Sequence, residues 1–269
     1  MTTATQIGVS SVLQACQAEN RAALIGYLPV GYPDLPTSIE AMDVMVRAGC
    51  DIVEIGIPYS DPLMDGPTIQ RAAEAALAGG TRVSDVFAAT AAVRAAGAPP
   101  LVMTYWNLVL HMGEGRFADR LVAAGGAGLI TPDLIPDEAG QWIAASERTG
   151  LDRVFLVAPS STTQRLSYVT ANARGFVYAA STMGVTGARD SIGDGAEALV
   201  ARIRQVSDIP VCVGLGVSTG AQAAQVAKFA DGVIVGSALV SCLLDRDRDH
   251  GLAGLAETVA ELAEGVRAR

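Results

Sequence analysis

The sequence predicts a single (β/α)8 barrel that spans residues 1–269. Eight short runs rich in β-branched residues recur along the chain, and Ala-rich amphipathic stretches long enough for a helix separate most of them. Eight such units in 269 residues match the size of this fold. No GxGxxG follows the first run, which argues against an open doubly wound sheet, and no Ser/Pro-rich linker or charge block divides the chain.

The predicted elements follow from this pattern in chain order. Strands are expected near residues 21–31, 50–58, 99–107, 126–133, 151–159, 175–182, 209–217 and 231–239. Stretches such as 38–49, 83–97, 137–150 and 220–230 are expected to form helices between them. We also expect an extra N-terminal helix over 10–21 that closes the barrel bottom, a short helix after the eighth strand, and a last helix over 256–269.

Charge and composition exclude several classes of protein. The net charge is −9, whereas phosphate contacts to nucleic acid need clustered Lys and Arg. No apolar run reaches the ~18 residues of a membrane helix, and residues 1–21 lack the basic and apolar regions of a signal peptide. We therefore expect a soluble cytoplasmic protein without nucleic-acid or membrane partners.

Several reactive side chains are scarce. The four cysteines are widely spaced, and the two histidines, His111 and His250, lie far apart, so no metal-ligand cluster is indicated. The single lysine, Lys228, falls in a predicted helix rather than at a strand end, which argues against a Schiff-base enzyme. A lyase or isomerase without a cofactor remains.

A carboxylate interrupts the second predicted strand, CDIVEIGIP. Val53, Ile55 and Ile57 share the side that suits the helix layer, so Glu54 should point into the barrel near its C-terminal mouth, where barrel enzymes hold their active sites. Burial there raises the pKa of a carboxyl group towards values useful for proton transfer. A structural glutamate paired with arginine is the alternative, but no arginine lies in the C-terminal half of a predicted strand.

A second acid, Asp65, lies in the proline-punctuated loop YSDPLMDGPT that follows this strand. A lone loop acid is most often only solvated, but this one belongs over the same mouth as Glu54. Two carboxylates at one site can divide the work, because one can move protons while the other stays ionised and stabilises a positive charge.

Glycine-rich segments mark the ends of the last three predicted strands. VGLGV (213–217) and VGSALV (235–240) sit where this fold usually binds phosphate, with free N–H groups at the start of a short helix. Tight packing is the alternative role for these glycines. STMGVTGARD (181–190) is either a lid over the substrate or an ordinary surface loop. Together these features predict an enzyme that acts on a phosphorylated small molecule.

Five stretches carry a family resemblance: EIGIPYSDPLMDGPTIQ, MTYWNLVL, GFVYAASTMGVTGARD, VGLGVSTGAQ and DGVIVGSALV. They resemble the tryptophan synthase α-subunit family, and the likeness runs along essentially the whole chain. It implies a lyase that cleaves indole-3-glycerol phosphate to indole and glyceraldehyde 3-phosphate in L-tryptophan biosynthesis. It also implies a β-subunit that carries pyridoxal phosphate, within an α2β2 heterotetramer, and no cofactor in this chain.

The resemblance implies roles for individual residues. Glu54 would be the acid–base glutamate and Asp65 the second catalytic carboxylate. Thr186 would belong to the covering loop, and Asp61 would contact the partner subunit. The phosphate would meet Gly187, Gly216, Gly236 and Ser237, and the rest of the substrate would meet Tyr178, Tyr27, Met103, Ile130, Leu156 and Leu215.

Three residues depart from the family pattern. Ile135 is inserted where the family often has Asp-Leu-Pro, in a loop expected to face the partner, and Tyr27 and Leu215 stand where phenylalanine is common. Two alternatives also stay open. The chain could be a stand-alone indole-3-glycerol-phosphate lyase, or a barrel that only binds phosphorylated ligands, although the presence of both carboxylates argues against the second.

Overall fold

The computed structural model describes residues 8–180, 194–214 and 216–268, and its strands form a nearly closed barrel. The described strands all pair in parallel, in the order β5-β4-β3-β2-β1-β9-β8-β7-β6. Since β5 and β6 follow each other in the chain, the predicted barrel is confirmed. The strands are β1 (Ala23–Pro29), β2 (Ile52–Gly56), β3 (Pro100–Met103), β4 (Gly128–Ile130), β5 (Asp152–Val154), β6 (Leu156–Val157), β7 (Val177–Ala180), β8 (Val211–Gly214) and β9 (Gly232–Val235).

The fifth predicted strand is divided in the structure. The expected run 151–159 becomes β5 and β6, separated by Phe155. The first part pairs with β4, where Val154 lies opposite Ile130, and the second part pairs with β7, where Leu156 lies opposite Tyr178. The two halves of one extended run therefore serve two different neighbours, which is why eight predicted runs give nine strands in the part of the chain that is described.

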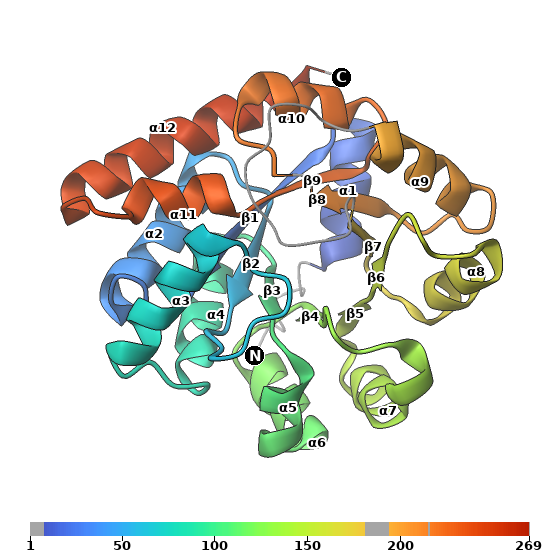
Figure 1. The fold of residues 1–269 in the computed structure, drawn as a ribbon, viewed down its shortest axis with the longest axis horizontal. Helices are drawn as coiled ribbons and strands as arrows, with labels where there is room; N and C mark the ends of the chain where they lie inside the picture. The colour runs from blue at the N-terminus through green and yellow to red at the C-terminus, as the bar shows by residue number, and fades with distance from the viewer. Residues whose placement is uncertain (1–7, 181–193, 215, 269) are drawn as a thin grey trace, which may run out of the picture.

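Helices surround the strands (Figure 1). No helix among the described residues is long and apolar enough to cross a membrane. The last helix begins at Arg248, well before the predicted start at residue 256. The helices are α1 (Val9–Ala18), α2 (Leu35–Ala48), α3 (Pro67–Ala78), α4 (Asp85–Ala96), α5 (Trp106–Met112), α6 (Glu114–Ala123), the 3-10 helix η1 (Pro136–Glu138), α7 (Gly140–Thr149), α8 (Thr163–Asn172), α9 (Asp194–Arg204), α10 (Gly220–Ala227), α11 (Ser237–Leu243) and α12 (Arg248–Arg267).

The helix α1 closes the N-terminal end of the barrel. Its buried residues Val9, Leu13 and Cys16 belong to one apolar cluster with inward-facing strand residues such as Ile25 and Ile52. A second, larger cluster fills the space between the strands and the outer helices. The predicted N-terminal helix is confirmed, and with the bottom filled by apolar side chains, the C-terminal mouth is where polar groups can gather.

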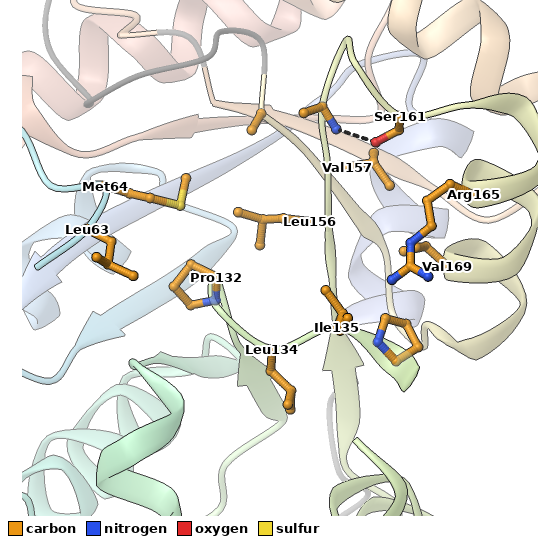
Figure 2. A pocket seen from close by; sticks show the side chains of 13 residues that line it. Leu63, Met64, Pro132, Leu134, Ile135, Leu156, Val157, Ser161, Arg165 and Val169 are labelled. Atoms are coloured by element: carbon orange, nitrogen blue, oxygen red, sulfur yellow. Dashed lines mark hydrogen bonds between the residues drawn. The ribbon is translucent and has the colours of Figure 1, made fainter. Parts of the chain in front are cut away.

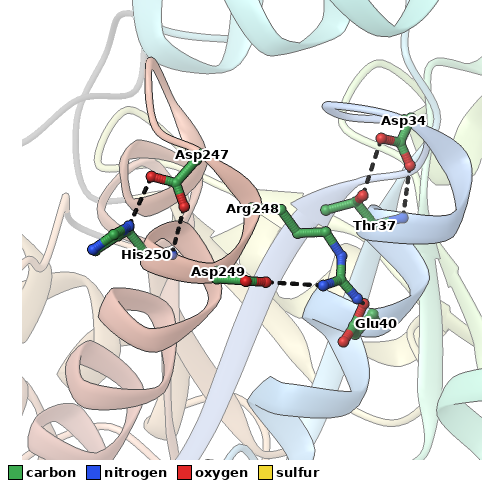
Figure 3. A network of polar contacts seen from close by, with 7 residues as sticks. All are labelled: Asp34, Thr37, Glu40, Asp247, Arg248, Asp249 and His250. Atoms are coloured by element: carbon green, nitrogen blue, oxygen red, sulfur yellow. Dashed lines mark hydrogen bonds and ion pairs between the residues drawn. The ribbon is translucent and has the colours of Figure 1, made fainter.

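Caps and ion pairs hold the helices around that mouth in place (Figure 3). Asp34 caps α2 by accepting from the Thr37 N–H at 2.8 Å, and Asp247 caps α12 by accepting from the His250 N–H at 3.1 Å. Arg248 of α12 pairs with Glu40 of α2, so the starts of these two helices are joined.

Candidate active site

Glu54 stands in the middle of β2 and points into the barrel. Ile52 on the same side belongs to the inner cluster, whereas Val53 and Ile55 belong to the cluster beneath the helices. The Glu54 side chain is buried, and its Oε2 has no hydrogen-bond partner among the described residues. Burial, followed by the nearby charge of Asp65, raises the pKa of Glu54 to about 8. Glu54 is therefore mostly protonated at neutral pH and can donate a proton.

Asp65 lies in the loop 57–66 between β2 and α3, and it is half-buried. Burial raises its pKa to about 6, although a hydrogen bond from the Tyr105 side chain opposes that rise. Its main-chain oxygen accepts a hydrogen bond of 2.8 Å from the Gln70 amide at the start of α3. Asp65 is thus mostly ionised at pH 7 while its neighbour Glu54 is mostly neutral.

Tyr105 is a site residue that the sequence reasoning missed. It lies two residues past the end of β3, is buried, and accepts hydrogen bonds from the N–H groups of Leu63 at 3.0 Å and Met64 at 3.1 Å. The ring of Tyr59 packs on it, with centroids 5.0 Å apart. One hydroxyl therefore organises the loop that carries Asp65. The available signal was its position, because a polar side chain just past a barrel strand lies at the active-site face.

Two tyrosines cross the mouth beside Glu54, and each lies over a glycine. A Cβ at Gly56 would overlap the Tyr27 hydroxyl, and a Cβ at Gly214 would overlap the Tyr178 hydroxyl. Tyr27 is paired in register with Glu54 across β1 and β2. The strand-end glycines thus make room for phenol groups next to the buried carboxyl.

The other pocket residues come from neighbouring strands. Met103 and Leu156 are half-buried and pack against the inner cluster, and Ile130 belongs to it. Met103 is the last residue of β3, Ile130 is the last residue of β4, and Leu156 is the first residue of β6. They line the inner wall of the barrel on the side away from β9, which gives an apolar surface opposite the glycine-rich strand ends.

The glycine-rich strand ends lie at β8 and β9. Gly216 has a φ of +70°, a left-handed conformation that favours glycine. Gly236 precedes α11, whose first residue is Ser237, and a Cβ at Gly236 would lie 3.4 Å from the Tyr27 ring. The short helix expected after the last strand is present, and its start lies next to the tyrosine beside Glu54.

Three predicted site residues fall outside the described part of the chain. They are Thr186, Gly187 and Leu215. The lid expected over 181–190 lies there too, so these assignments stay predictions from the sequence.

A cavity of about 430 Å³ opens beside the mouth (Figure 2). Leu63 and Met64 of the Asp65 loop lie on one side, Leu134 and Ile135 of the loop after β4 on another, and Leu156 lies between them. Leu63 is 71% exposed and Ile135 is 45% exposed, unusual values for large apolar side chains. Asp61 is exposed in the same loop as Leu63, where its carboxylate accepts from the Ser60 hydroxyl at 2.6 Å.

The thiols and metal-binding residue types contribute no further site in the described residues. Cys16, Cys50 and Cys212 are buried, and burial is the main cause that raises the pKa of each thiol. Over the same residues, no group of three or more His, Cys, Asp or Glu side chains is placed to hold a metal ion.

Comparisons with known proteins find close relatives along almost the entire chain. A family model described as tryptophan synthase alpha chain matches residues 13–267. The tryptophan synthase alpha chain of Mycobacterium avium (strain 104) is 65% identical over 258 residues, which cover 96% of this chain and 94% of the relative. That of Mycobacterium marinum is 63% identical over 258 residues, with the same coverage of both chains.

Solved structures give the same result. A chain in a structure of Mycobacterium tuberculosis tryptophan synthase has a TM-score of 0.92 and 62% identity, over 96% of this chain and 98% of that one. Tryptophan synthase subunit alpha from Legionella pneumophila has a TM-score of 0.87 at 30% identity, over 96% and 97% of the two chains. The backbone is thus retained as the sequence diverges.

Proposed function

Because the chain belongs to the tryptophan synthase alpha chain family, we propose that it cleaves indole-3-glycerol phosphate to indole and glyceraldehyde 3-phosphate at Glu54 and Asp65. The observation that carries the residue assignment is the pair of neighbouring carboxyl groups with different pKa values, about 8 for Glu54 and about 6 for Asp65. Environments that push two pKa values apart are typical of an acid paired with an electrostatic stabiliser.

Glu54 moves the proton twice in the proposed reaction. It first protonates C3 of the indole ring, which becomes an indolenium cation and leaves Glu54 ionised. The bond between C3 and the glycerol carbon then breaks, and its electron pair restores neutral indole. The hydroxyl on the departing carbon gives its proton to Glu54 and becomes the aldehyde of glyceraldehyde 3-phosphate. Glu54 ends in the protonated form in which it began.

Asp65 stabilises the cation formed between those steps. It stays ionised at neutral pH, and we assign it to accept a hydrogen bond from the indole N–H, where the positive charge develops. Tyr105 supports this role because its hydroxyl bonds both the Asp65 side chain and the preceding loop backbone. A group held in place before the reaction costs no reorganisation during it.

The two ends of the substrate are assigned to the two sides of the mouth. Gly216, Gly236 and Ser237 are proposed to hold the phosphate through backbone N–H groups, with Gly187 as a further contact from the sequence. The indole is assigned to the apolar side, with the substrate contacts Tyr27, Tyr178, Met103, Ile130, Leu156 and Leu215. The proposed steps are proton transfers and the cleavage of one C–C bond without any redox change, so they ask for no cofactor from this chain.

Membership of this family implies a β-subunit partner. We propose that the partner covers the mouth, in an α2β2 assembly in the cytoplasm, and that it carries the pyridoxal phosphate. The exposed apolar side chains of Leu63 and Ile135, beside the exposed carboxylate of Asp61, support this placement. Large apolar groups rimmed by polar ones are typical of a protein interface. Indole is apolar, and such an arrangement would pass it to the partner rather than to solvent.

The test of this function is the Glu54→Gln variant, which keeps the side-chain shape but cannot carry a proton. Indole release from indole-3-glycerol phosphate should fall by ~10²–10⁴-fold, while calorimetry shows that glycerol-phosphate analogues still bind. Glu40→Gln, in the ion pair with Arg248 on the outer surface, is the matched control and should retain turnover. Turnover by Glu54→Gln close to that of the parent protein would refute the assignment.

A further inference from the structure

The ring of Tyr27 spans the floor of the mouth between the proposed phosphate loop and Glu54. At one end, a Cβ on Gly236 would lie 3.4 Å from the Tyr27 ring and 3.6 Å from its Cβ. At the other end, the hydroxyl lies over Gly56, two residues beyond Glu54 on the same side of β2. Because β1 and β2 are adjacent and Tyr27 is in register with Glu54, both side chains point into the barrel from neighbouring positions.

In the part of the chain that the structure describes, the Glu54 carboxyl group lacks a hydrogen-bond donor for one of its oxygens. Glu54 Oε2 is buried and has no hydrogen-bond partner within the described residues. A buried carboxylate is costly unless it accepts hydrogen bonds, and Glu54 must be ionised between its two proton transfers. A neutral donor beside it would therefore act at the one stage of the reaction when Glu54 carries a charge.

The groups that face Glu54 and Tyr27 narrow the choice of donor. They are Asp65, Tyr105, Tyr178 and, on the Glu54 side, the buried thiol of Cys212. Asp65 is an acceptor when ionised, the Tyr105 hydroxyl is engaged with the Asp65 loop, and a thiol is a weak donor. Tyr178 reaches the mouth from β7, which is not adjacent to β2, whereas Tyr27 comes from the adjoining strand.

We propose that Tyr27 is a positioning residue for the acid–base cycle, whose hydroxyl donates a hydrogen bond to the ionised Glu54 carboxylate. The inference rests on the proposed function of Glu54 and adds a polar role to a residue otherwise assigned only to the substrate pocket. Burial and the nearby carboxylates raise the pKa of Tyr27 well above its ordinary value, so the phenol keeps its proton and remains a donor.

Tyr27→Phe tests the proposal because it removes one oxygen and keeps the ring that packs against Gly236. Without the donor, the ionised form of Glu54 is less stable, so the pKa of Glu54 should rise by about one unit, a tenfold change in its ionisation equilibrium. Carbon-13 NMR of protein labelled at the glutamate carboxyl carbon measures this directly, and Glu54→Gln identifies the resonance. Tyr32→Phe, which removes a buried phenol near Arg71 and Asp245, is the control and should leave the titration unchanged.

The pH dependence of catalysis should shift in the same direction as the pKa of Glu54. The basic limb of the kcat/KM profile should move about one pH unit higher in Tyr27→Phe, with a plateau several-fold lower and little change in KM. An unmoved titration and an unmoved limb would overturn the proposal, even if the plateau fell, because a packing role predicts that result. If the titration moves but the parent protein releases no indole, the proposed function fails while the contact between Tyr27 and Glu54 stands.

Discussion

Replacing Tyr105 by phenylalanine separates the charge of Asp65 from its placement. The substitution keeps the ring that packs on Tyr59. It removes the hydroxyl that accepts hydrogen bonds from the Leu63 and Met64 N–H groups and donates one to the Asp65 carboxylate. A net hydrogen bond is worth ~1 kcal/mol, so the free energy of unfolding should fall by roughly 1–3 kcal/mol in urea titrations. The Asp65 carboxylate should then be held less firmly in the position proposed for its contact with the indole N–H.

The effect on catalysis divides into two parts of different size. With a pKa of about 6, Asp65 is roughly 90% ionised at pH 7. Losing the Tyr105 hydrogen bond raises that pKa further, and a rise of about one unit would leave half of the molecules ionised, a loss of only about twofold. Misplacing a catalytic group by ~1 Å can cost ~10²-fold. We therefore expect kcat/KM to fall by tens-fold or more, mostly through placement.

Indole release at pH 7 and pH 8.5 tells the two parts apart. At the higher pH Asp65 is ionised in both proteins, so the ratio of parent to variant should shrink by no more than about twofold. Tyr59→Phe is the matched control, since its hydroxyl lies 3.5 Å from the Asn107 amide and leaves the Asp65 loop contacts intact. If the parent and Tyr105→Phe proteins had equal rates at pH 8.5, the hydroxyl would act only on the charge of Asp65. If their rates were equal at both pH 7 and pH 8.5, the hydroxyl would have no part in catalysis and Tyr105 would act only through packing of its ring.

Three further predictions concern the phosphate loop, stability and the partner. Gly236→Asp should fold, because a Cβ there lies 3.4 Å from the Tyr27 ring, an ordinary van der Waals contact. Calorimetry should nevertheless show sharply weaker binding of glycerol-phosphate analogues, and unchanged affinity would show that this loop does not bind the phosphate. The pKa of Glu54 rises from 4.5 to about 8 on folding, so its contribution to stability is full below pH 4.5 and is lost as the pH rises through 8. Chemical unfolding should therefore show that Glu54→Gln removes a pH dependence of at most about 5 kcal/mol between pH 5 and pH 9, and an equally steep dependence in the variant contradicts the burial argument. A cognate β-subunit should raise indole release at least about tenfold, roughly 1.4 kcal/mol of barrier, and Asp61→Ala should lower that stimulation more than the basal rate; equal rates with and without the partner favour a stand-alone lyase.

The candidate site shows how far local patterns reach. Glu54 was found because a charge in an alternating apolar strand violates the pattern, and the side on which it lies follows from the period of two. Asp65 needed the further rule that loops after barrel strands lie at one face. Tyr105 carried only one weak signal, its position just past a barrel strand, because an aromatic residue there is also typical of ordinary core. Its role depends on a contact between segments more than forty positions apart, which local spacing does not encode.

The sequence by itself determined the barrel, its end helices, the inward direction of Glu54 and the family, because periodicity, strand-end glycines and long motifs are local properties of the chain. Only the tertiary structure decided how the fifth strand divides at Phe155, since that division reflects pairing with β4 on one side and β7 on the other. Only the tertiary structure set the pKa values of Glu54 and Asp65 apart, since burial and the distance between charges arise when strands and loops from different parts of the chain converge.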